Sequence, residues 1–287
     1  AVPLNTHIVS HIWYNKHIFE EYGLNIPKTW DDFKQISEIL RENEIEPFAA
    51  AKGWLTYNFL PALITVLGPE GYLAWGNGEI AFTDPKVKEA FKLYADAFVS
   101  AYMFGWSGYG WAEAANELMK GNAAMYLNGD WVVAYFEQAG WVPGEDFDFF
   151  PAPGTEDVMI MQVDALAHPL GSPDPDGAEK LLLVAGSIEG QSAFNAKKGS
   201  VAANLGVPPD IYGVLLKRTY ERIQRINVEG ALLPNSLFML PPSLNQELSR
   251  QLEIFALNPT EETLEIVTQT LENMRQELLD QGAFVKW

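Results

Sequence analysis

The apolar and polar positions alternate between strand-like and helix-like patterns along the whole chain. Short apolar or alternating runs predict strands at 1–9, 47–51, 76–82, 123–127, 147–150 and 158–169. Apolar residues at helical spacing predict helices at 11–22, 30–40, 58–67, 85–98, 111–120, 131–138, 177–187, 191–196, 211–226, 246–257 and 261–279. Residues 230–243 are too proline-rich for regular structure. Strands and helices therefore alternate, and the predicted fold class is α/β.

The segment WAEAANELMKGNAAMYLNGDW, residues 111–131, combines a helix, a glycine turn, a short strand and a second turn. This order leaves Asp130 and Trp131 at the end of a strand, where ligands bind in α/β proteins. Asp130 also fits the N-cap of the helix that Trp131 starts, and we favour that role. From the residues alone, a tryptophan that opens an amphipathic helix, as Trp111 does, is more often part of the core.

Other side chains have two interpretations each. Trp54 and Tyr57 precede an apolar helix and lie off its stripe, so they line either a cleft or the core. Asp164 lies within the predicted strand 158–169, where a carboxylate also caps turns. Lys198 lies near the end of a predicted helix, where a lysine complements the helix dipole.

Composition removes several classes of partner. The 38 acidic residues exceed the 19 basic ones, so the formal net charge of -19 disfavours nucleic acid and anionic membranes. The absence of cysteine excludes disulfides, thiolate metal sites and cysteine nucleophiles. No run approaches the roughly 20 apolar residues of a membrane-spanning helix. Nine tryptophans suit a cleft that stacks on a neutral ligand.

The motifs of metal, nucleotide and nucleophilic chemistry are missing from the sequence. His7, His11, His17 and His168 do not have the spacing of a metal site, and no GxxxxGK[ST], strand-following GxGxxG or GxSxG motif occurs. We therefore predict no catalytic residue, metal or cofactor.

Four segments together carry a resemblance. IWYNKHIFEEYGLNIPKTWDDF, ELMKGNAAMYLNGDW, the strand with Asp164 and FNAKKGSVAA resemble the family 1 extracellular solute-binding proteins of sugar ABC importers. This family includes maltose-binding protein, and the order and spacing look most like its glucose- and galactose-binding members. The resemblance implies a type II periplasmic-binding-protein fold, with two lobes that close around a sugar by hinge bending.

The resemblance also divides the chain. It implies a crossing strand with a remnant of the N-terminal lobe at 1–11, the C-terminal lobe at 12–160 and a second part of that lobe at 208–287. Residues 161–207 would hold a second crossing strand and a returning segment of the N-terminal lobe. Members normally begin on the order of a hundred residues earlier. We therefore expect one nearly complete lobe and part of the second, with most of the N-terminal lobe absent.

The family pattern assigns the ligand contacts to three sets of side chains: stacking aromatic planes, polar contacts and peripheral residues. These are Trp111 and Trp131 as stacking planes, Asp164 and Lys198 as polar contacts, and Trp54, Tyr57, His7 and Asn235 around them. The implied ligand is a neutral sugar, either a monosaccharide such as glucose or galactose or a short oligosaccharide. The implied partner is a membrane permease, and the implied state is a periplasmic or extracellular monomer, free or lipid-anchored through an N-terminus beyond this chain.

Two alternatives stay open. A glycoside-acting enzyme would need two carboxylates roughly 5 to 10 Å apart, and Asp130 and Asp164 are the available pair. A lobe fragment would fold but bind sugar weakly or not at all, because half of the contacts to the sugar would be absent.

Overall fold

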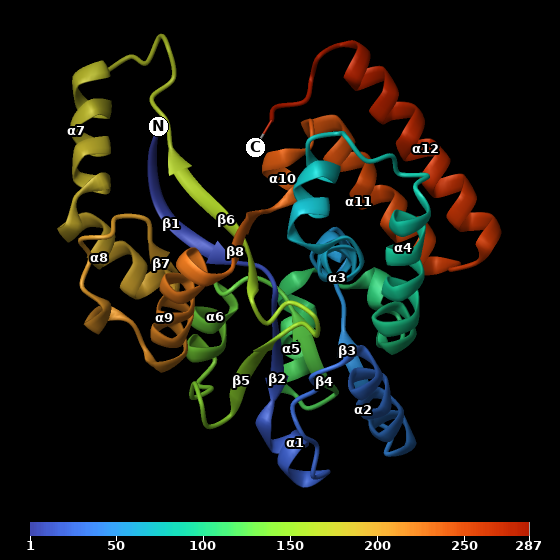
Figure 1. Cartoon of the computed structure of the whole chain (residues 1–287). Helices are drawn as coiled ribbons and strands as arrows, with labels where there is room; N and C mark the ends of the chain where they lie inside the picture. The colour runs from blue at the N-terminus through green and yellow to red at the C-terminus, as the bar shows by residue number, and fades with distance from the viewer. Residues whose placement is uncertain (287) are drawn as a thin grey trace.

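The computed structural model describes residues 1–286, which form two four-stranded sheets joined at residues 9 and 10 (Figure 1). The first sheet has the order β7-β1-β6-β8. Its strands are β1 (Val2–Ile8), β6 (Val158–Leu166), β7 (Val201–Ala202) and β8 (Ala231–Pro234). β1 runs antiparallel to β6 and β7, whereas β8 runs parallel to β6. Residues far apart in the sequence are thereby brought into register across β1 and β6.

The second sheet has the order β3-β4-β2-β5. Its strands are β2 (His11–Asn15), β3 (Glu46–Ala49), β4 (Ala123–Leu127) and β5 (Phe147–Pro151). β4 and β5 flank β2 antiparallel, and β3 pairs parallel with β4. Because β1 and β2 follow one another directly, the chain passes from one sheet into the other at its start.

Helices cover both sheets, and several of them begin at the capping residues that the sequence predicts. The helices are α1 (Lys16–Glu21), α2 (Trp30–Glu42), α3 (Leu55–Gly76), α4 (Pro85–Ala97), α5 (Trp111–Met119), α6 (Val132–Gln138), α7 (Pro175–Gly186), α8 (Ile188–Lys198), α9 (Val214–Glu229), α10 (Ser236–Met239), α11 (Pro242–Leu257) and α12 (Glu261–Asp280). Short 3-10 turns lie at Val99–Ala101, Trp106–Gly108 and Pro209–Ile211. Thr29 and Asp32 form the expected capping box of α2.

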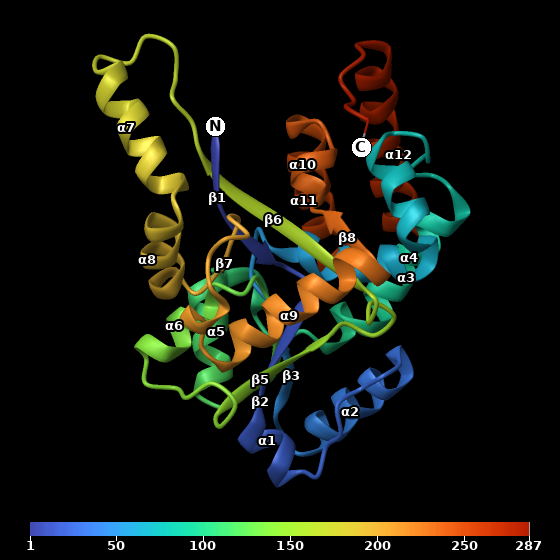
Figure 2. The ribbon, with the colours of Figure 1, turned by 60° about the vertical axis from the view of Figure 1, so that its left-hand side comes forward.

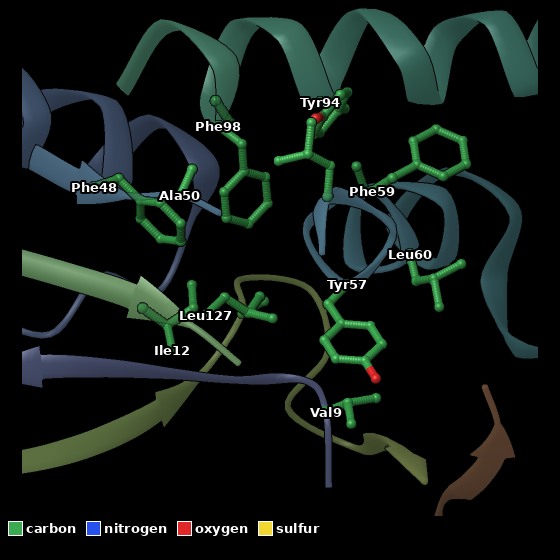
Figure 3. Packing of buried hydrophobic residues seen from close by; sticks show 14 of the residues in the cluster. Val9, Ile12, Phe48, Ala50, Tyr57, Phe59, Leu60, Tyr94, Phe98 and Leu127 are labelled. Atoms are coloured by element: carbon green, nitrogen blue, oxygen red, sulfur yellow. The ribbon is translucent and has the colours of Figure 1, made fainter. Parts of the chain in front are cut away.

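The main core lies between the second sheet and helices α2 to α4. Figure 3 shows its aromatic centre, where Phe48 of β3 meets Phe98 with ring centroids 5.2 Å apart. Phe59 of α3 contacts Tyr94 of α4 at 5.8 Å. Each large ring buries a large apolar area, and this burial stabilises this part of the molecule.

A smaller second core lies under the first sheet. It joins Ile8, Met159 and Val201 of that sheet to Ile226 of α9, and Figure 2 shows α9 running across this region. Leu215, near the start of the same helix, belongs to the main core instead. Helix α9 therefore connects the two cores. The lobe boundaries that we predict from the sequence stay a prediction.

Helix α7 stands out from the rest of the molecule beside the free ends of β1 and β6 (Figure 1). None of its described residues is buried. Leu181, Leu183 and Val184 expose 60%, 68% and 64% of their surface, so the segment KLLLVAG presents apolar side chains to solvent. No helix in the described part of the chain is long and apolar enough to cross a membrane.

Three sequence-based assignments of secondary structure are wrong. Residues 11–15 form strand β2 rather than the start of a helix, because Trp13 lies in the middle of a buried sheet. The edge strand predicted at 76–82 is a turn in the described structure. Residues 231–239, which we expected to be irregular, form β8 and α10, because Pro234 ends the strand and Pro241 precedes α11.

Candidate ligand-binding site

A polar face on the two crossing strands β1 and β6 forms the floor of the candidate site. Asn5 lies opposite Asp164 and His7 lies opposite Gln162 in the antiparallel register. Because side chains alternate along a strand, these four share one face. Asn5 donates from its side-chain amide to Asp164 Oδ2 at 3.1 Å and accepts the Asp164 backbone N–H at 3.0 Å. These two hydrogen bonds between the Asn5 side chain and Asp164 fix the position of the carboxylate.

His7 lies between two carboxylates and is buried. Its Nδ1 contacts Asp130 Oδ1, and its Nε2 lies 3.4 Å from Asp164 Oδ2 and 3.2 Å from the Asn5 amide nitrogen. A neutral imidazole that donates from Nδ1 leaves Nε2 to accept from Asn5. Asp130 therefore orients the ring of His7 through its contact with Nδ1.

The helix-cap role predicted for Asp130 is wrong. The N-cap of α6 is Trp131, and no side chain caps that helix. Both carboxylate oxygens of the fully buried Asp130 are already in use, one by His7 and the other by the backbone N–H of Ile8 at 3.2 Å. A buried carboxylate must have its oxygens hydrogen-bonded, and these two partners supply the bonds without the helix.

Asp164 and Lys198 form the exposed polar end of this network. Lys198, in the last turn of α8, places Nζ 3.3 Å from Asp164 Oδ2, and the Asp164 side chain is 39% exposed. Partial burial acts to raise the pKa of Asp164, but the hydrogen bond from Asn5, the nearby positive charge of Lys198 and the hydrogen bond from Lys198 outweigh it and lower the pKa. Among the described residues no hydrogen bond to Asp164 Oδ1 is recorded, so a ligand hydroxyl can donate to it.

Three aromatic rings form a corner above the polar face. Trp131 meets His7 edge-on at 5.0 Å and an interplanar angle of 87°. Its ring centroid lies 5.8 Å from that of Trp54 and 6.2 Å from that of Tyr57. Trp131 folds back over Gly129, where a Cβ atom would lie 1.9 Å from the indole. The tight turn thus needs glycine to place the indole in this corner.

Tyr57 and Asn235 meet at Gln162 of β6. The Tyr57 hydroxyl donates to Gln162 Oε1 at 2.8 Å, and the Asn235 amide donates to the same oxygen at 3.4 Å. Figure 3 shows the Tyr57 ring reaching from α3 toward Val9. Tyr57 lies in the first turn of α3 rather than in a loop before it. Burial is the main cause that raises the pKa of Tyr57, so its hydroxyl stays a donor.

A groove with a cavity volume of about 260 Å³ adjoins this corner. Trp54 and Tyr57 line it from the start of α3, Gln162 lines it from β6, and Asn235 lines it from the turn after β8. The groove therefore shares side chains with the aromatic corner.

The structure brings seven of the eight predicted contact residues into one connected cluster. They are His7, Trp54, Tyr57, Trp131, Asp164, Lys198 and Asn235, with the last joined through Gln162. Trp111 lies apart from it: its ring packs on Tyr135 at 5.3 Å, and its carbonyl accepts from Tyr126. Within residues 1–286 no cluster of three or more metal-ligating side chains occurs.

Sequence analysis missed Asn5 and Gln162. Both are buried or half-buried amides that hold predicted contact residues in place. The available signal was the two-residue spacing from Asn5 to His7 and from Gln162 to Asp164, which places each pair on one face of a strand.

The arrangement of these two sheets and their helices is the type II periplasmic-binding-protein fold of similar solved structures, as the family resemblance implied. The chain belongs to the family of bacterial extracellular solute-binding proteins, which it matches over residues 2–192.

Several known proteins are similar in sequence to most of this chain. An uncharacterized ABC transporter extracellular-binding protein of Pyrococcus horikoshii is 35% identical over 241 residues, which cover 82% of this chain and 53% of that protein. A probable sugar-binding periplasmic protein of Mesorhizobium japonicum is 29% identical, with 85% and 60% covered. A xylose/arabinose-binding protein of Haloferax volcanii is 26% identical, with 85% and 54% covered. The chain thus spans little more than half the length of these relatives.

Solved structures show the same fold. The bacterial solute receptor AcbH, described as having an exclusive preference for β-D-galactopyranose, superposes with a TM-score of 0.86 at 22% identity, over 96% of this chain and 72% of that one. The maltose-bound MalE3 of T. maritima superposes with a TM-score of 0.70 at 18% identity, over 96% and 72%.

Proposed function

We propose that the chain is a sugar-binding receptor that delivers a neutral carbohydrate to the permease of an ABC importer. The observation that carries the proposal is the aromatic corner around Trp131, placed directly against the His7 and Asp164 network. A sugar presents a face of C–H groups and a rim of hydroxyls. Aromatic planes bind the face, and charge-assisted hydrogen bonds bind the rim.

Each side chain has a proposed role in that binding. Trp131 is the principal stacking plane, and Trp54 and Tyr57 close the corner around the sugar. Asp164 accepts from a hydroxyl through Oδ1, and Lys198 donates to a hydroxyl oxygen. Trp111 stays a predicted second plane, whose ring would have to reach the ligand from beside Tyr135.

The relatives and neighbours support the ligand class and the location. Sugar-binding periplasmic proteins and a xylose/arabinose-binding protein are among the similar sequences, and receptors for galactose and maltose are among the similar folds. We accordingly propose a periplasmic or extracellular location, with the permease as the partner and the protein as a monomer. Lipid anchoring is part of the same proposal.

Isothermal titration calorimetry with galactose, glucose, xylose, maltose and raffinose tests the proposal. We expect heat of binding with at least one neutral sugar, and a loss of that heat in Trp131→Ala. Ser243→Ala, an exposed position of α11 away from the cluster, is the matched control. Absence of binding to every sugar, both by this folded chain and by a version extended at its N-terminus to the length of the relatives, would refute the receptor function.

We propose that the site binds without catalysis. A glycosidase needs two carboxylates facing the scissile bond with room between them. The candidate pair lies on either side of the buried His7 ring, and Asp130 is fully buried with both oxygens hydrogen-bonded. Release of reducing sugar from a glycoside, abolished by Asp164→Asn, would contradict this conclusion.

Weak binding by this chain alone is a second candidate, which the exposed apolar side chains of α7 favour. Leu181, Leu183 and Val184 of α7 are exposed. Helix α7 lies beside the ends of β1 and β6 (Figure 1), so a sugar on the polar face of these strands would lack an enclosing wall on that side. A version extended at its N-terminus to the length of the relatives should then bind sugar more tightly. Equal affinity of the two versions would rule out this candidate.

A further inference from the structure

The groove beside the aromatic corner has the chemistry of a surface that binds a neutral, polar ligand. One wall comes from the start of α3, with Trp54 and Thr56, and the facing wall comes from α11, with Asn245 and Ser249 one turn apart. None of the described residues that line it carries a formal charge. A neutral, polar ligand suits such a surface better than an acidic or phosphorylated one.

Two amides of the groove are oriented by the protein itself. Asn245 Oδ1 accepts from Ser236 Oγ at 2.9 Å, and Gln162 Oε1 accepts from Tyr57. Both carbonyl oxygens are thus engaged, whereas no partner is recorded for either NH2 group among residues 1–286. The amide nitrogens are therefore free to donate to ligand hydroxyls.

Two hydroxyl groups add to these donors. The side chains of Thr56 and Ser249 both line the groove, and in the described structure neither makes a recorded hydrogen bond. Each hydroxyl can both donate and accept, which matches the hydroxyls of a sugar. The two amide-bearing and the two hydroxyl-bearing side chains all line a volume of about 260 Å³.

The groove continues from the proposed sugar site rather than standing apart from it. Trp54 lines the groove, and its ring lies 5.8 Å from that of Trp131. Gln162 lines it as well and lies opposite His7 across the strand pair. A ligand that covers Trp131 can therefore extend past Trp54 into the groove.

We infer that the groove is a second glycosyl subsite, so that the ligand is a neutral oligosaccharide or glycoside of at least two sugar units. One unit lies against Trp131, and the next lies between Trp54 and Asn245. This inference rests on the proposed sugar-binding function and narrows its ligand class.

Calorimetric titration of the 287-residue chain with monosaccharides and oligosaccharides tests the inference. Galactose and glucose are compared with melibiose, lactose, maltose and raffinose. We expect at least one oligosaccharide to bind about tenfold more tightly than its own monosaccharide units, because the additional unit gains hydrogen bonds in the groove.

Two variants separate the subsite from the rest of the site. Ser249→Phe fills the groove and should abolish the oligosaccharide advantage while monosaccharide affinity stays unchanged. Ser243→Phe, at an exposed position of the same helix outside the groove, should leave both affinities unchanged. Asn245→Asp keeps the acceptor for Ser236 and removes the amide donor, and should also lose the advantage. Thermal melting shows that each variant is folded.

The outcomes distinguish the inference from the function on which it rests. If monosaccharides and oligosaccharides bind equally and Ser249→Phe changes neither, the inference is wrong and the receptor function stands. If Ser249→Phe abolishes monosaccharide binding too, the groove is the primary site and the inference is overturned. If no sugar binds to any of these proteins or to a version extended at its N-terminus to the length of the relatives, the receptor function fails and the inference fails with it.

Discussion

The carboxylate of Asp130 contacts Nδ1 of His7, and both side chains are buried from solvent. His7 lies in β1 of the first sheet, and Asp130 lies in the turn that leaves β4 of the second sheet. The second Asp130 oxygen accepts the backbone N–H of Ile8, so a single side chain joins the two sheets at their junction. Trp131, the proposed stacking plane, is the next residue in the chain.

Asp130→Asn should destabilise the fold although it preserves the shape of the side chain. An asparagine can accept from His7 or from the Ile8 N–H with its single oxygen, and its NH2 group then faces the other donor. Leaving one buried donor unpaired costs about 1–3 kcal/mol of the free energy of unfolding. Urea unfolding measures this cost, and calorimetry should show weaker sugar binding as His7 and Trp131 lose their support.

Asp157→Asn is the control for that variant. Asp157 is 80% exposed and makes one ion pair of 3.5 Å with Arg225, so its removal should change the free energy of unfolding by less than about 1 kcal/mol. Equal losses in the two variants would mean that the buried position of Asp130 has no special role.

Gly129→Ala should displace Trp131 without touching any polar group of the site. The added methyl would lie 1.9 Å from the indole, so the ring must leave the corner that it forms with Trp54 and Tyr57. We expect a shift in tryptophan fluorescence and a loss of sugar affinity close to that of Trp131→Ala. Gly108→Ala, where nothing lies within 4 Å of the new methyl, should leave both properties unchanged, and an unaltered affinity in Gly129→Ala would contradict the proposed position of the ring.

Trp131→Ala should weaken sugar binding more than Trp111→Ala does. Trp131 contacts His7, Trp54 and Tyr57, whereas the ring of Trp111 packs on Tyr135. We expect a loss of about tenfold or more for the first variant, and for the second mainly a lower melting temperature. Calorimetry and thermal melting of the two variants measure these effects. A larger loss of affinity in Trp111→Ala would restore it as the principal stacking plane.

Elements with a local end signal could be predicted from the sequence, because those signals act over a few residues. Thr29 caps α2 and Thr260 caps α12, as their spacing to the following apolar stripe indicates. Strand β2 was misread because it lies between β4 and β5 and is largely buried. Without polar residues on one face the two-residue period disappears, and the apolar positions fit a helix by coincidence.

The candidate site was predictable in its residue types but not in its connections. His7 and Asp164 were identified separately, through the family resemblance. Asn5, which joins them, pairs with Asp164 across 159 positions, and strand register over such a separation depends on the packing of the whole sheet. For the same reason the role of Asp130 could not be separated from helix capping: its partner His7 lies 123 positions away.

Stability should fall below pH 6.5 because of His11, a buried residue that the proposed site does not use. Its ring stacks on Phe149 at 4.0 Å, and Arg222 Nη1 lies 3.3 Å from Nε2. Burial, followed by the positive charges of Arg222 and Arg218, holds the pKa of His11 well below its usual value of 6.5. Below pH 6.5 the unfolded chain takes up a proton that the folded protein refuses, so acid favours unfolding until the pH reaches the folded-state pKa.

His11→Phe should reduce this acid sensitivity, since phenylalanine keeps the stacking and does not titrate. Urea unfolding at pH 7, 6 and 5 should show a decrease in the free energy of unfolding that is shallower than in the wild type by up to about 1.4 kcal/mol per pH unit. His168→Phe, at an exposed position after β6, should keep the wild-type slope. The carboxylates are common to all three proteins, so the difference in slope isolates the histidine. Parallel pH profiles for wild type and His11→Phe would show that His11 takes up its proton equally well in the folded and unfolded chain.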